Sequence, residues 1–282
     1  MLEVVTPVLR AYGTSEIHLD NLILEQGYLQ TSPEYAMKCL IADSGRSIYQ
    51  ICPAFRGGEE GRRHRLEFQM LEWYRVDYSL CDLMNDLESL LTRVHSALAP
   101  DDALLPQAHP LTRVAYATLF KDRFGACPHT ASDNELVDLC RSLPLAHLGE
   151  EARRADLLDA LFSTGIEPGL VEGTLVSDYP ACQAALAAYR TDEEGHQVAD
   201  RFELFISGME IANAYQELLD SKELSRRFSE NNAVRRALGK REVADDPELL
   251  EATARMPRCA GVALGIDRLL MAFFGETSIS EI

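Results

Sequence analysis

The chain has 282 residues, of which 46% are hydrophobic and 26% charged, and these fractions are those of a globular protein rather than a disordered one. Its formal net charge at pH 7 is −18, which argues against general binding to the phosphate backbone of nucleic acids. No stretch reaches the roughly 20 apolar residues that a membrane helix needs.

The N-terminal part of the chain predicts a strand and a helix. Residues 2–9 are rich in β-branched side chains and predict a short strand. A helix that runs to about residue 42 is expected next, because Ser32 can cap it, Pro33 suits its first position and Glu34 favours the positive end of its dipole.

A hairpin and a second helix follow. Residues 47–55 and 67–75 predict two antiparallel strands joined by a long, arginine-rich loop that opens at a Gly-Gly pair. Leucines at helical spacing predict a helix over residues 80–98. Residues 99–170 carry prolines between short helical stretches, which indicates a small helical insertion.

The remaining segments indicate the fold class. They predict strands over 170–176 and within 199–213, a charged helix over 221–238, and a glycine-spaced strand over 261–265 that leads into a helix. Hairpin-connected strands with inserted helices indicate an α+β fold with an antiparallel β-sheet flanked by helices. We expect one domain over 1–282, with the insertion at about 99–170.

The hairpin carries the first side chains suited to a nucleotide. Arg56 ends its first strand, where a guanidinium can hold a phosphate or a carboxylate through two hydrogen bonds. Phe68 on the returning strand can stack on a purine base. The alternative is a solvated charged hairpin with Phe68 in the core.

Two further groups lie in the C-terminal third. Glu210 and Glu217, with Asn213 between them, are suited to magnesium bound to a triphosphate, or else form an ordinary acidic surface. Arg268 occupies the first turn of a predicted helix, where the dipole disfavours a cation, so a phosphate or an adenine face could use its guanidinium. A surface salt bridge is the alternative for Arg268, and capping alone is the alternative for the segment at 31–34.

In order and content these features resemble the three motifs of class II aminoacyl-tRNA synthetases. The strand with a proline at 4–7 is similar to the first motif. Phe-Arg followed by His-x-x-x-Phe within 55–68 is similar to the second, and the glycine-spaced run at 261–268 to the third. The resemblance implies a class II synthetase-like catalytic domain.

Within that class the chain is similar to the lysyl branch, through Thr-Ser-Pro-Glu at 31–34 and Glu-Phe-x-Met-Leu-Glu-Trp-Tyr at 67–74. The segment at 179–186 and Ala263 resemble the short paralogues without an anticodon-binding barrel, the elongation factor P–(R)-β-lysine ligases. This resemblance implies that ATP, with Mg²⁺, activates (R)-β-lysine or lysine as an adenylate. The acyl group then passes to a lysine side chain of elongation factor P, a post-translational modification.

The resemblance also implies roles for individual residues. Arg56 would hold the α-phosphate and the substrate carboxylate, and Arg56 and Arg268 would be the catalytic residues. The expected ATP-binding residues are Arg56, Glu59, His64, Phe68, Glu210, Ile211, Gly265 and Arg268, with Phe68 and Arg268 on either side of the adenine. The expected amino-acid-binding residues are Ser32, Pro33, Glu34, Tyr74, Asn213 and Glu217, and the expected Mg²⁺ ligands are Glu210 and Glu217.

Departures from the family pattern leave two alternatives open. Gly58 stands where the second motif has a glutamate, and Arg65 and Leu66 replace an Asn-Pro pair, so an inactive paralogue that binds an amino acid or a partner protein is one alternative. A free-standing core that acts on tRNA is the other, although the acidic charge argues against it.

Partners and location follow from the same comparison and from the cysteines. The family implies a homodimer, but the helix that normally builds its interface has no counterpart before the first strand. The seven cysteines are scattered and the N-terminus lacks the features of a signal peptide, so we expect a cytoplasmic protein without a membrane partner.

Overall fold

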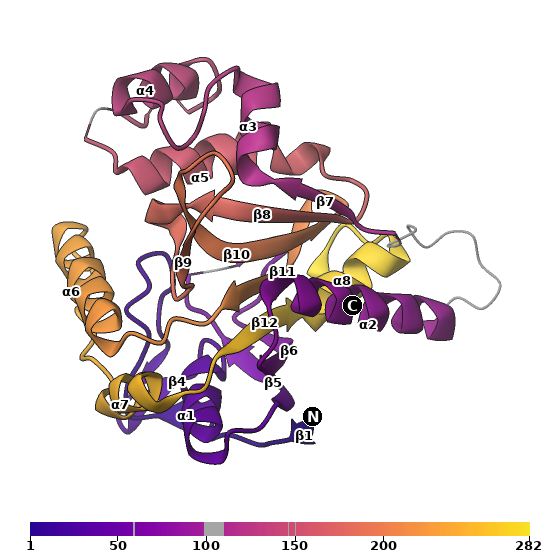
Figure 1. Ribbon diagram of the computed structural model, residues 1–282, viewed down its shortest axis with the longest axis vertical. Coiled ribbons are helices and arrows are strands. Elements are labelled where there is room, and N and C mark those ends of the chain that lie inside the picture. Colours follow the sequence, from indigo (N-terminus) through magenta and orange to yellow (C-terminus); the bar gives the residue numbers. More distant parts are fainter. Residues whose placement is uncertain (59, 99–109, 146, 150) are drawn as a thin grey trace. The chain divides into compact units, whose positions relative to one another are not determined.

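The computed structural model describes residues 1–58, 60–98, 110–145, 147–149 and 151–282. These residues divide into two units, one formed by Met1–Leu83 with Gln216–Ile282 and the other by Met84–Tyr215 (Figure 1). The helix α2 (Leu80–Leu98) begins in the first unit and continues in the second. None of the helices among these residues is long and apolar enough to cross a membrane.

The strands of the first unit provide a platform for the predicted site. They follow the order β1-β5-β6-β12, in which β1 is parallel to β5 and the other pairs are antiparallel. Their bounds are β1 (Leu2–Glu3), β5 (Ile48–Phe55), β6 (Glu67–Val76) and β12 (Cys259–Gly265). A separate small sheet has the order β2-β4-β3, formed by β2 (Leu9–Arg10), β4 (Gly27–Leu29) and β3 (Ile23–Leu24).

Four α-helices complete the first unit: α1 (Glu34–Ser44), α6 (Ser221–Ala237), α7 (Pro247–Arg255) and α8 (Ile266–Phe274), followed by a 3₁₀ helix at Ile279–Glu281. Figure 1 shows α7 next to α1. Met37 and Ile41 of α1 belong to one buried cluster with Ile48, Tyr74 and Met256. The apolar side of α1 therefore covers one face of β5 and β6.

The start of α1 is displaced by one residue from the prediction, because Pro33 rather than Ser32 is the N-cap. The Ser32 hydroxyl accepts a hydrogen bond from the Glu34 N–H at 3.0 Å. Pro33 precedes the first helical residue rather than occupying it. The helix ends at Gly45, whose φ of 61° lies in the left-handed region that favours glycine, and the Gly45 N–H donates to the Ile41 carbonyl.

The strands of the second unit follow the order β11-β10-β8-β7, and β9 pairs with β10. Here β7 and β8 are parallel, and the other pairs are antiparallel. The bounds are β7 (Thr112–Ala115), β8 (Thr174–Pro180), β9 (Tyr189–Thr191), β10 (Gln197–Ile206) and β11 (Met209–Gln216).

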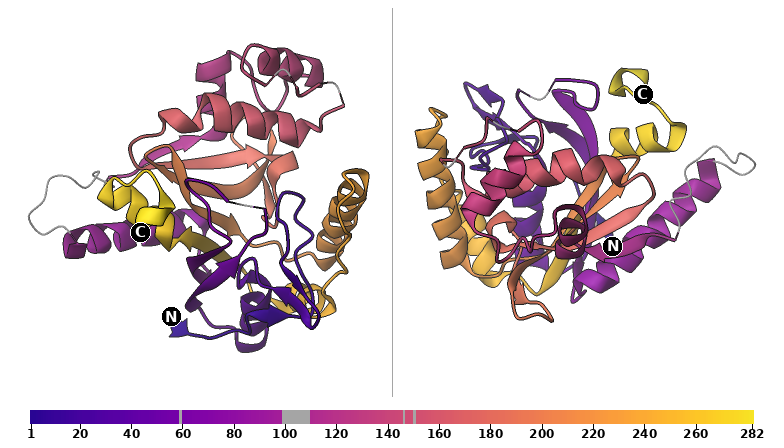
Figure 2. Two further views of the ribbon diagram at one scale, coloured as in Figure 1. Left: turned by 180° about the vertical axis from the view of Figure 1, so that it is seen from behind. Right: turned by 90° about the horizontal axis from the view of Figure 1, so that it is seen from above.

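The helices of the second unit are α3 (Tyr116–Phe124), α4 (Asp133–Arg141) and α5 (Arg154–Gly165), with 3₁₀ helices at Glu167–Gly169 and Ala181–Gln183. The views from the front and from behind place all three α-helices on one side of the strands (Figures 1 and 2). Between the layers lies a cluster of buried apolar side chains that includes Tyr116, Phe162, Tyr179 and Phe205.

The α+β prediction is confirmed, whereas two predicted strands are wrong in their bounds. Instead of one strand over 2–9, β1 and β2 flank a break at Pro7, because proline has no N–H to donate to a ladder. The strand predicted at 170–176 is β8, which begins at Thr174 and reaches Pro180. The three helices α3–α5 lie within the predicted insertion at about 99–170, and the second unit extends beyond it on both sides.

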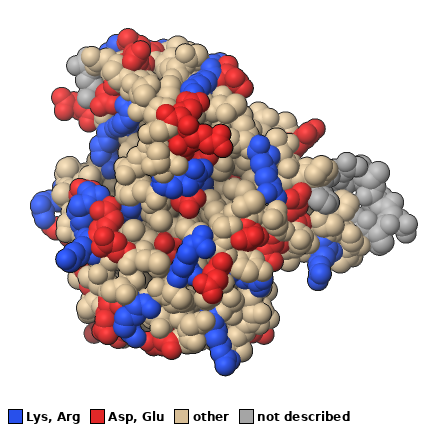
Figure 3. Space-filling view, in the orientation of Figure 1, with Lys and Arg blue, Asp and Glu red and all other residues tan. Residues whose placement is uncertain are grey.

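Charges of both signs are mixed on the face shown in Figure 3. Lysine and arginine side chains there alternate with aspartate and glutamate rather than forming a large area of one sign. Although the chain has a net charge of −18, this face therefore shows no single large acidic area.

Candidate active site

One face of β6 presents several of the predicted site residues. Alternate residues of a strand share a face, so Phe68, Glu72 and Tyr74 lie on the same side. In the ladder with β12, Gly261 is opposite Tyr74 and Ala263 is opposite Glu72. These small residues leave the space above the strands to the side chains of β6 and of neighbouring segments.

Gly261 is required at its position by a close approach. A Cβ built there would lie 2.3 Å from Cε1 of Tyr74 and 2.5 Å from Oε1 of Glu217, and real Cβ atoms do not come this close to other atoms. The Glu217 N–H donates to the Cys259 carbonyl at 3.0 Å, which fixes Glu217 beside the start of β12. The glycine therefore lets Tyr74 and Glu217 meet over the strand.

Four charged side chains gather at this end of the face, and we call Glu34, Glu72, Glu217 and Lys38 the acidic cluster. Lys38 Nζ lies 2.6 Å from Glu34 Oε1 and 2.7 Å from Glu217 Oε2. The Tyr74 hydroxyl donates to Glu72 Oε2 at 3.1 Å. Glu72, Glu217 and Lys38 are only 1%, 2% and 4% exposed, so water does not screen these charges.

The cluster has more negative than positive charge. Its three carboxylates face one ammonium group, which leaves two negative charges unbalanced when all four groups are ionised. Oε1 of Glu72 and Oε1 of Glu217 are buried and have no hydrogen-bond partner among the described residues. Buried carboxylate oxygens without partners are costly, so the cluster is suited to a ligand that carries ammonium groups.

The pKa values of the cluster reflect this imbalance. Burial raises the pKa of Glu72 to about 8, and the nearby charge of Glu34 raises it further. Burial also raises the pKa of Glu217, which Lys38 opposes. Burial alone would lower the pKa of Lys38, but Glu217 and Glu34 outweigh it and raise that pKa, so Lys38 stays protonated.

Arg56 and Phe68 lie together at the hairpin end of the same strands. Cζ of Arg56 is 5.1 Å from the centroid of the Phe68 ring, a cation–π distance. Nε of Arg56 donates to the Thr31 carbonyl at 3.4 Å, just before the segment that starts α1. Phe68 is half-buried and carries this contact, so the alternative that it belongs to the core is not favoured.

Arg268 reaches the hairpin from α8. Its Nε donates to the Arg63 carbonyl at 3.4 Å, and the neighbouring Asp267 accepts a hydrogen bond from the Gln69 N–H at 2.7 Å. Of the two predicted catalytic arginines, Arg56 therefore contacts the Phe68 ring and Arg268 contacts the hairpin loop. Adenine binding between Phe68 and Arg268 stays a prediction.

The other predicted site residues lie on several different elements. His64 is exposed in the hairpin loop, and Gly265 ends β12 opposite Met70. Glu210, Ile211 and Asn213 lie on β11 in the second unit, where Glu210 contributes to the raised pKa of the buried Glu203. Their meeting with the first-unit residues, including Glu210 with Glu217 around Mg²⁺, stays a prediction. Glu59 lies outside the described residues.

Two members of the acidic cluster were missed as site residues. Lys38 is four residues from Glu34 and points into the buried side of α1, where a lysine is rare unless paired. Glu72 interrupts an otherwise apolar, buried stretch of β6. A charged residue at a buried position of the predicted pattern is the signal that could have identified both.

Comparisons with known proteins agree with this geometry. The family model for class II tRNA synthetases (D, K and N) matches residues 1–282. Curated proteins named elongation factor P–(R)-β-lysine ligase share 37% identity in Histophilus somni, 39% in Mannheimia succiniciproducens and 36% in Salmonella dublin. Each alignment covers 100% of this chain and 87% of the relative.

Proposed function

Because the chain belongs to the class II tRNA synthetase family (D, K and N), we propose that it is an ATP-dependent ligase that modifies elongation factor P with (R)-β-lysine or lysine. The relatives that share 36–39% of its sequence over its full length carry the name of that ligase. The cytoplasm is the compartment in which such a ligase meets its acceptor.

The observation that carries the proposal is the acidic cluster. A diamino acid brings two ammonium groups, and the cluster offers two buried carboxylate oxygens, Oε1 of Glu72 and Oε1 of Glu217, that have no hydrogen-bond partner among the described residues. Burial raises the pKa of Glu72 to about 8 in the unliganded protein, and a bound ammonium group favours its ionised form. Once desolvated, each ammonium needs such an acceptor. Glu72 and Glu217 supply these oxygens, while Lys38 pairs with Glu34 and with the other oxygen of Glu217.

The proposed chemistry has two steps. In the first, a carboxylate oxygen of the amino acid attacks the α-phosphorus of ATP, the bond to the β-phosphate oxygen breaks, and pyrophosphate leaves. In the second, the ε-amine of a lysine on elongation factor P attacks the acyl carbon, loses a proton and displaces AMP. Arg56 serves both reacting groups of the first step, because a guanidinium binds a carboxylate or a phosphate through paired hydrogen bonds.

The predicted Mg²⁺ ligands, Glu210 and Glu217, have the carboxylate oxygens that this ion prefers. Oε1 of Glu217 has no hydrogen-bond partner among the described residues and so is free for a cation, whether a metal or an ammonium. Bound Mg²⁺ would neutralise charge on the phosphates of ATP.

Mass spectrometry of the acceptor tests the proposed function. Elongation factor P incubated with the enzyme, ATP, Mg²⁺ and (R)-β-lysine should gain the mass of one β-lysyl group, and the Glu217→Gln variant should slow this gain by at least about 100-fold. Glu67→Gln, at an exposed position of β6, is the matched control and should react as the wild type does. An unmodified acceptor together with charging of tRNA would favour a synthetase core, and an absence of ATP binding would favour an inactive paralogue.

A further inference from the structure

The second unit contains another group of chemically active side chains, none of which has a role in the proposed reaction. His129 lies in the turn between α3 and α4, and Asp192 and His196 lie in the loop between β9 and β10. One potential ligand atom from each residue lies within 4.8 Å of the others. We propose that these three residues bind a divalent transition-metal ion, with Zn²⁺ as the best match.

The donor set favours zinc over the harder cations. Two imidazole nitrogens and one carboxylate oxygen form a three-ligand zinc site, in which a water takes the fourth position. Magnesium and calcium prefer oxygen ligands alone. Zinc bonds of about 2.0–2.1 Å in a tetrahedron put the ligand atoms about 3.4 Å apart. The ligand atoms of the three side chains lie within 4.8 Å of one another here, so the longest of these distances needs to shorten by roughly 1 to 1.5 Å when the ion binds.

His129 provides the observation that points to a ligand. Its Nε2 is buried and has no hydrogen-bond partner among the described residues. Its ring stacks on that of His196, with the centroids 4.9 Å apart and an interplanar angle of 26°. Buried polar atoms are almost always satisfied, and a metal ion bound in the plane of the His129 ring, at the edge of the stacked pair, would satisfy this nitrogen.

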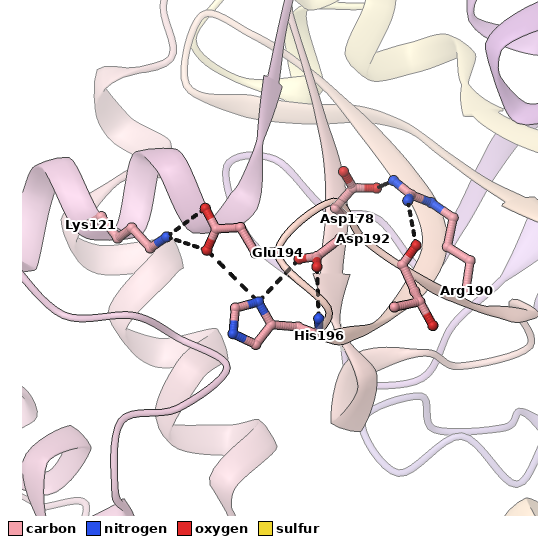
Figure 4. Close-up of polar contacts among 7 residues, drawn as sticks. Lys121, Asp178, Arg190, Asp192, Glu194 and His196 are labelled. Atoms are coloured by element: carbon pink, nitrogen blue, oxygen red, sulfur yellow. Dashed lines mark hydrogen bonds and ion pairs between the residues drawn. The ribbon is translucent and has the colours of Figure 1, made fainter.

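The loop between β9 and β10 holds the other two ligands in place. Asp192 Oδ1 accepts a hydrogen bond from the His196 N–H at 2.7 Å, and its Oδ2 lies 3.3 Å from His196 Nδ1 (Figure 4). Gly195 adopts a φ of 89°, which lets the loop turn back on itself. The aspartate is therefore oriented by the loop before any ion binds.

A salt bridge links the loop to α3 beside this group. Lys121 Nζ lies 2.9 and 3.1 Å from the two carboxylate oxygens of Glu194, and Glu194 Oε2 lies 3.9 Å from His196 Nδ1 (Figure 4). Glu194 therefore lies beside the His196 ring, beyond hydrogen-bond distance, and its salt bridge with Lys121 ties the loop to α3. A metal ion would add a second link, between this loop and the turn after α3.

Calorimetric titration of the full-length protein with Zn²⁺ tests the site. The wild type should bind one equivalent and melt at a higher temperature in its presence. His129→Ala and His196→Ala should bind at least about 100-fold more weakly, a larger loss than the roughly 10- to 100-fold that follows removal of a group that only hydrogen-bonds to a ligand. His147→Ala, at an exposed histidine of the same unit, is the matched control and should bind like the wild type.

The seven free cysteines could bind zinc instead of the proposed histidine and aspartate ligands. The visible spectrum of bound Co²⁺ distinguishes thiolate ligands from nitrogen and oxygen ligands. Cobalt bound to the wild type should show visible d–d bands of a nitrogen and oxygen site without a thiolate charge-transfer band. Should either alanine variant not fold, this wild-type spectrum and the rise in melting temperature with Zn²⁺ decide the question. Absence of zinc binding, a strong thiolate band, or unchanged affinity in a folded His129→Ala variant would overturn the proposal.

Discussion

At the scale of single residues, Lys38 acts as a fixed counter-charge inside the proposed amino-acid site. It joins a helix carboxylate, Glu34, to a strand-end carboxylate, Glu217, through contacts of 2.6 and 2.7 Å. The ammonium is buried with Glu217, whereas Glu34 is partly exposed, so water has little access to the contact between Lys38 and Glu217. The lysine thus sets how many negative charges remain for a bound substrate.

Replacement of Lys38 by methionine should destabilise the protein strongly. The change leaves the buried carboxylate of Glu217 and the partly buried one of Glu34 without their counter-ion, and breaking a buried pair in this way costs about 3–5 kcal/mol. Urea denaturation followed by circular dichroism measures the loss in the free energy of unfolding. Lys222→Met, at an exposed position of α6, should change it by no more than about 0.5 kcal/mol. Equal stabilities of the two variants would contradict the assigned role.

Glu72 should make stability depend on pH. Burial raises its pKa in the folded protein to about 8 from an ordinary value of 4.5, so between these pH values the folded state holds a proton that the unfolded state has released. The free energy of unfolding should therefore fall as pH rises from about 4.5 to about 8, by up to about 5 kcal/mol for this group. Glu72→Gln should weaken this dependence of the unfolding free energy on pH, whereas Glu67→Gln should leave it unchanged. Parallel curves for the wild type and both variants would show that Glu72 is not its cause.

Glu34, Tyr74 and Glu217 were named from the sequence, and the structure brings them together with Lys38 and Glu72, which were not. Their part in binding an amino acid stays a prediction. The pairing of Lys38 with Glu217 joins residues 179 positions apart in the chain, so no local pattern could predict it. It depends on the register that places Gly261 opposite Tyr74.

At the scale of elements, the β5–β6 hairpin carries Arg56 and Phe68, two of the residues proposed to bind ATP. Its strands were predicted almost to the residue, because alternating side chains and a Gly-Gly opening are strong local signals. The strand predicted at 170–176 was displaced for a non-local reason. The carbonyls of Leu170 and Val171 accept from Gly208 and Ser207, so these residues close the β10–β11 turn rather than join β8.

Two arginines of the hairpin should separate the two steps of the reaction. Arg56→Ala removes the proposed phosphate and carboxylate clamp and should lower the rate of adenylate formation by about 10²–10³-fold. Arg63→Ala keeps the backbone carbonyl that Arg268 contacts, so it should spare adenylate formation and slow mainly the transfer to the acceptor. Single-turnover measurements of adenylate formation and of acyl transfer test this assignment. Arg63→Ala slowing both steps equally would contradict it.

At the scale of the whole molecule, an acidic chain is matched to the cationic substrate that we propose. A net charge of −18 disfavours nucleic acids in general, and the acidic cluster is the place where we propose that negative charge receives a substrate. The sequence predicted the α+β class from the order of its elements. It could not define the two units, since their bounds depend on which distant segments pack together.

The most direct measurement is ATP–pyrophosphate exchange by the wild type with (R)-β-lysine, lysine and norleucine, which lacks the terminal ammonium. We expect (R)-β-lysine to give the highest kcat/KM, and norleucine a value at least about 100-fold below that of lysine, because it would leave buried carboxylate oxygens without a partner. Exchange with norleucine as efficient as with lysine would show that the acidic cluster does not receive the substrate's ammonium groups.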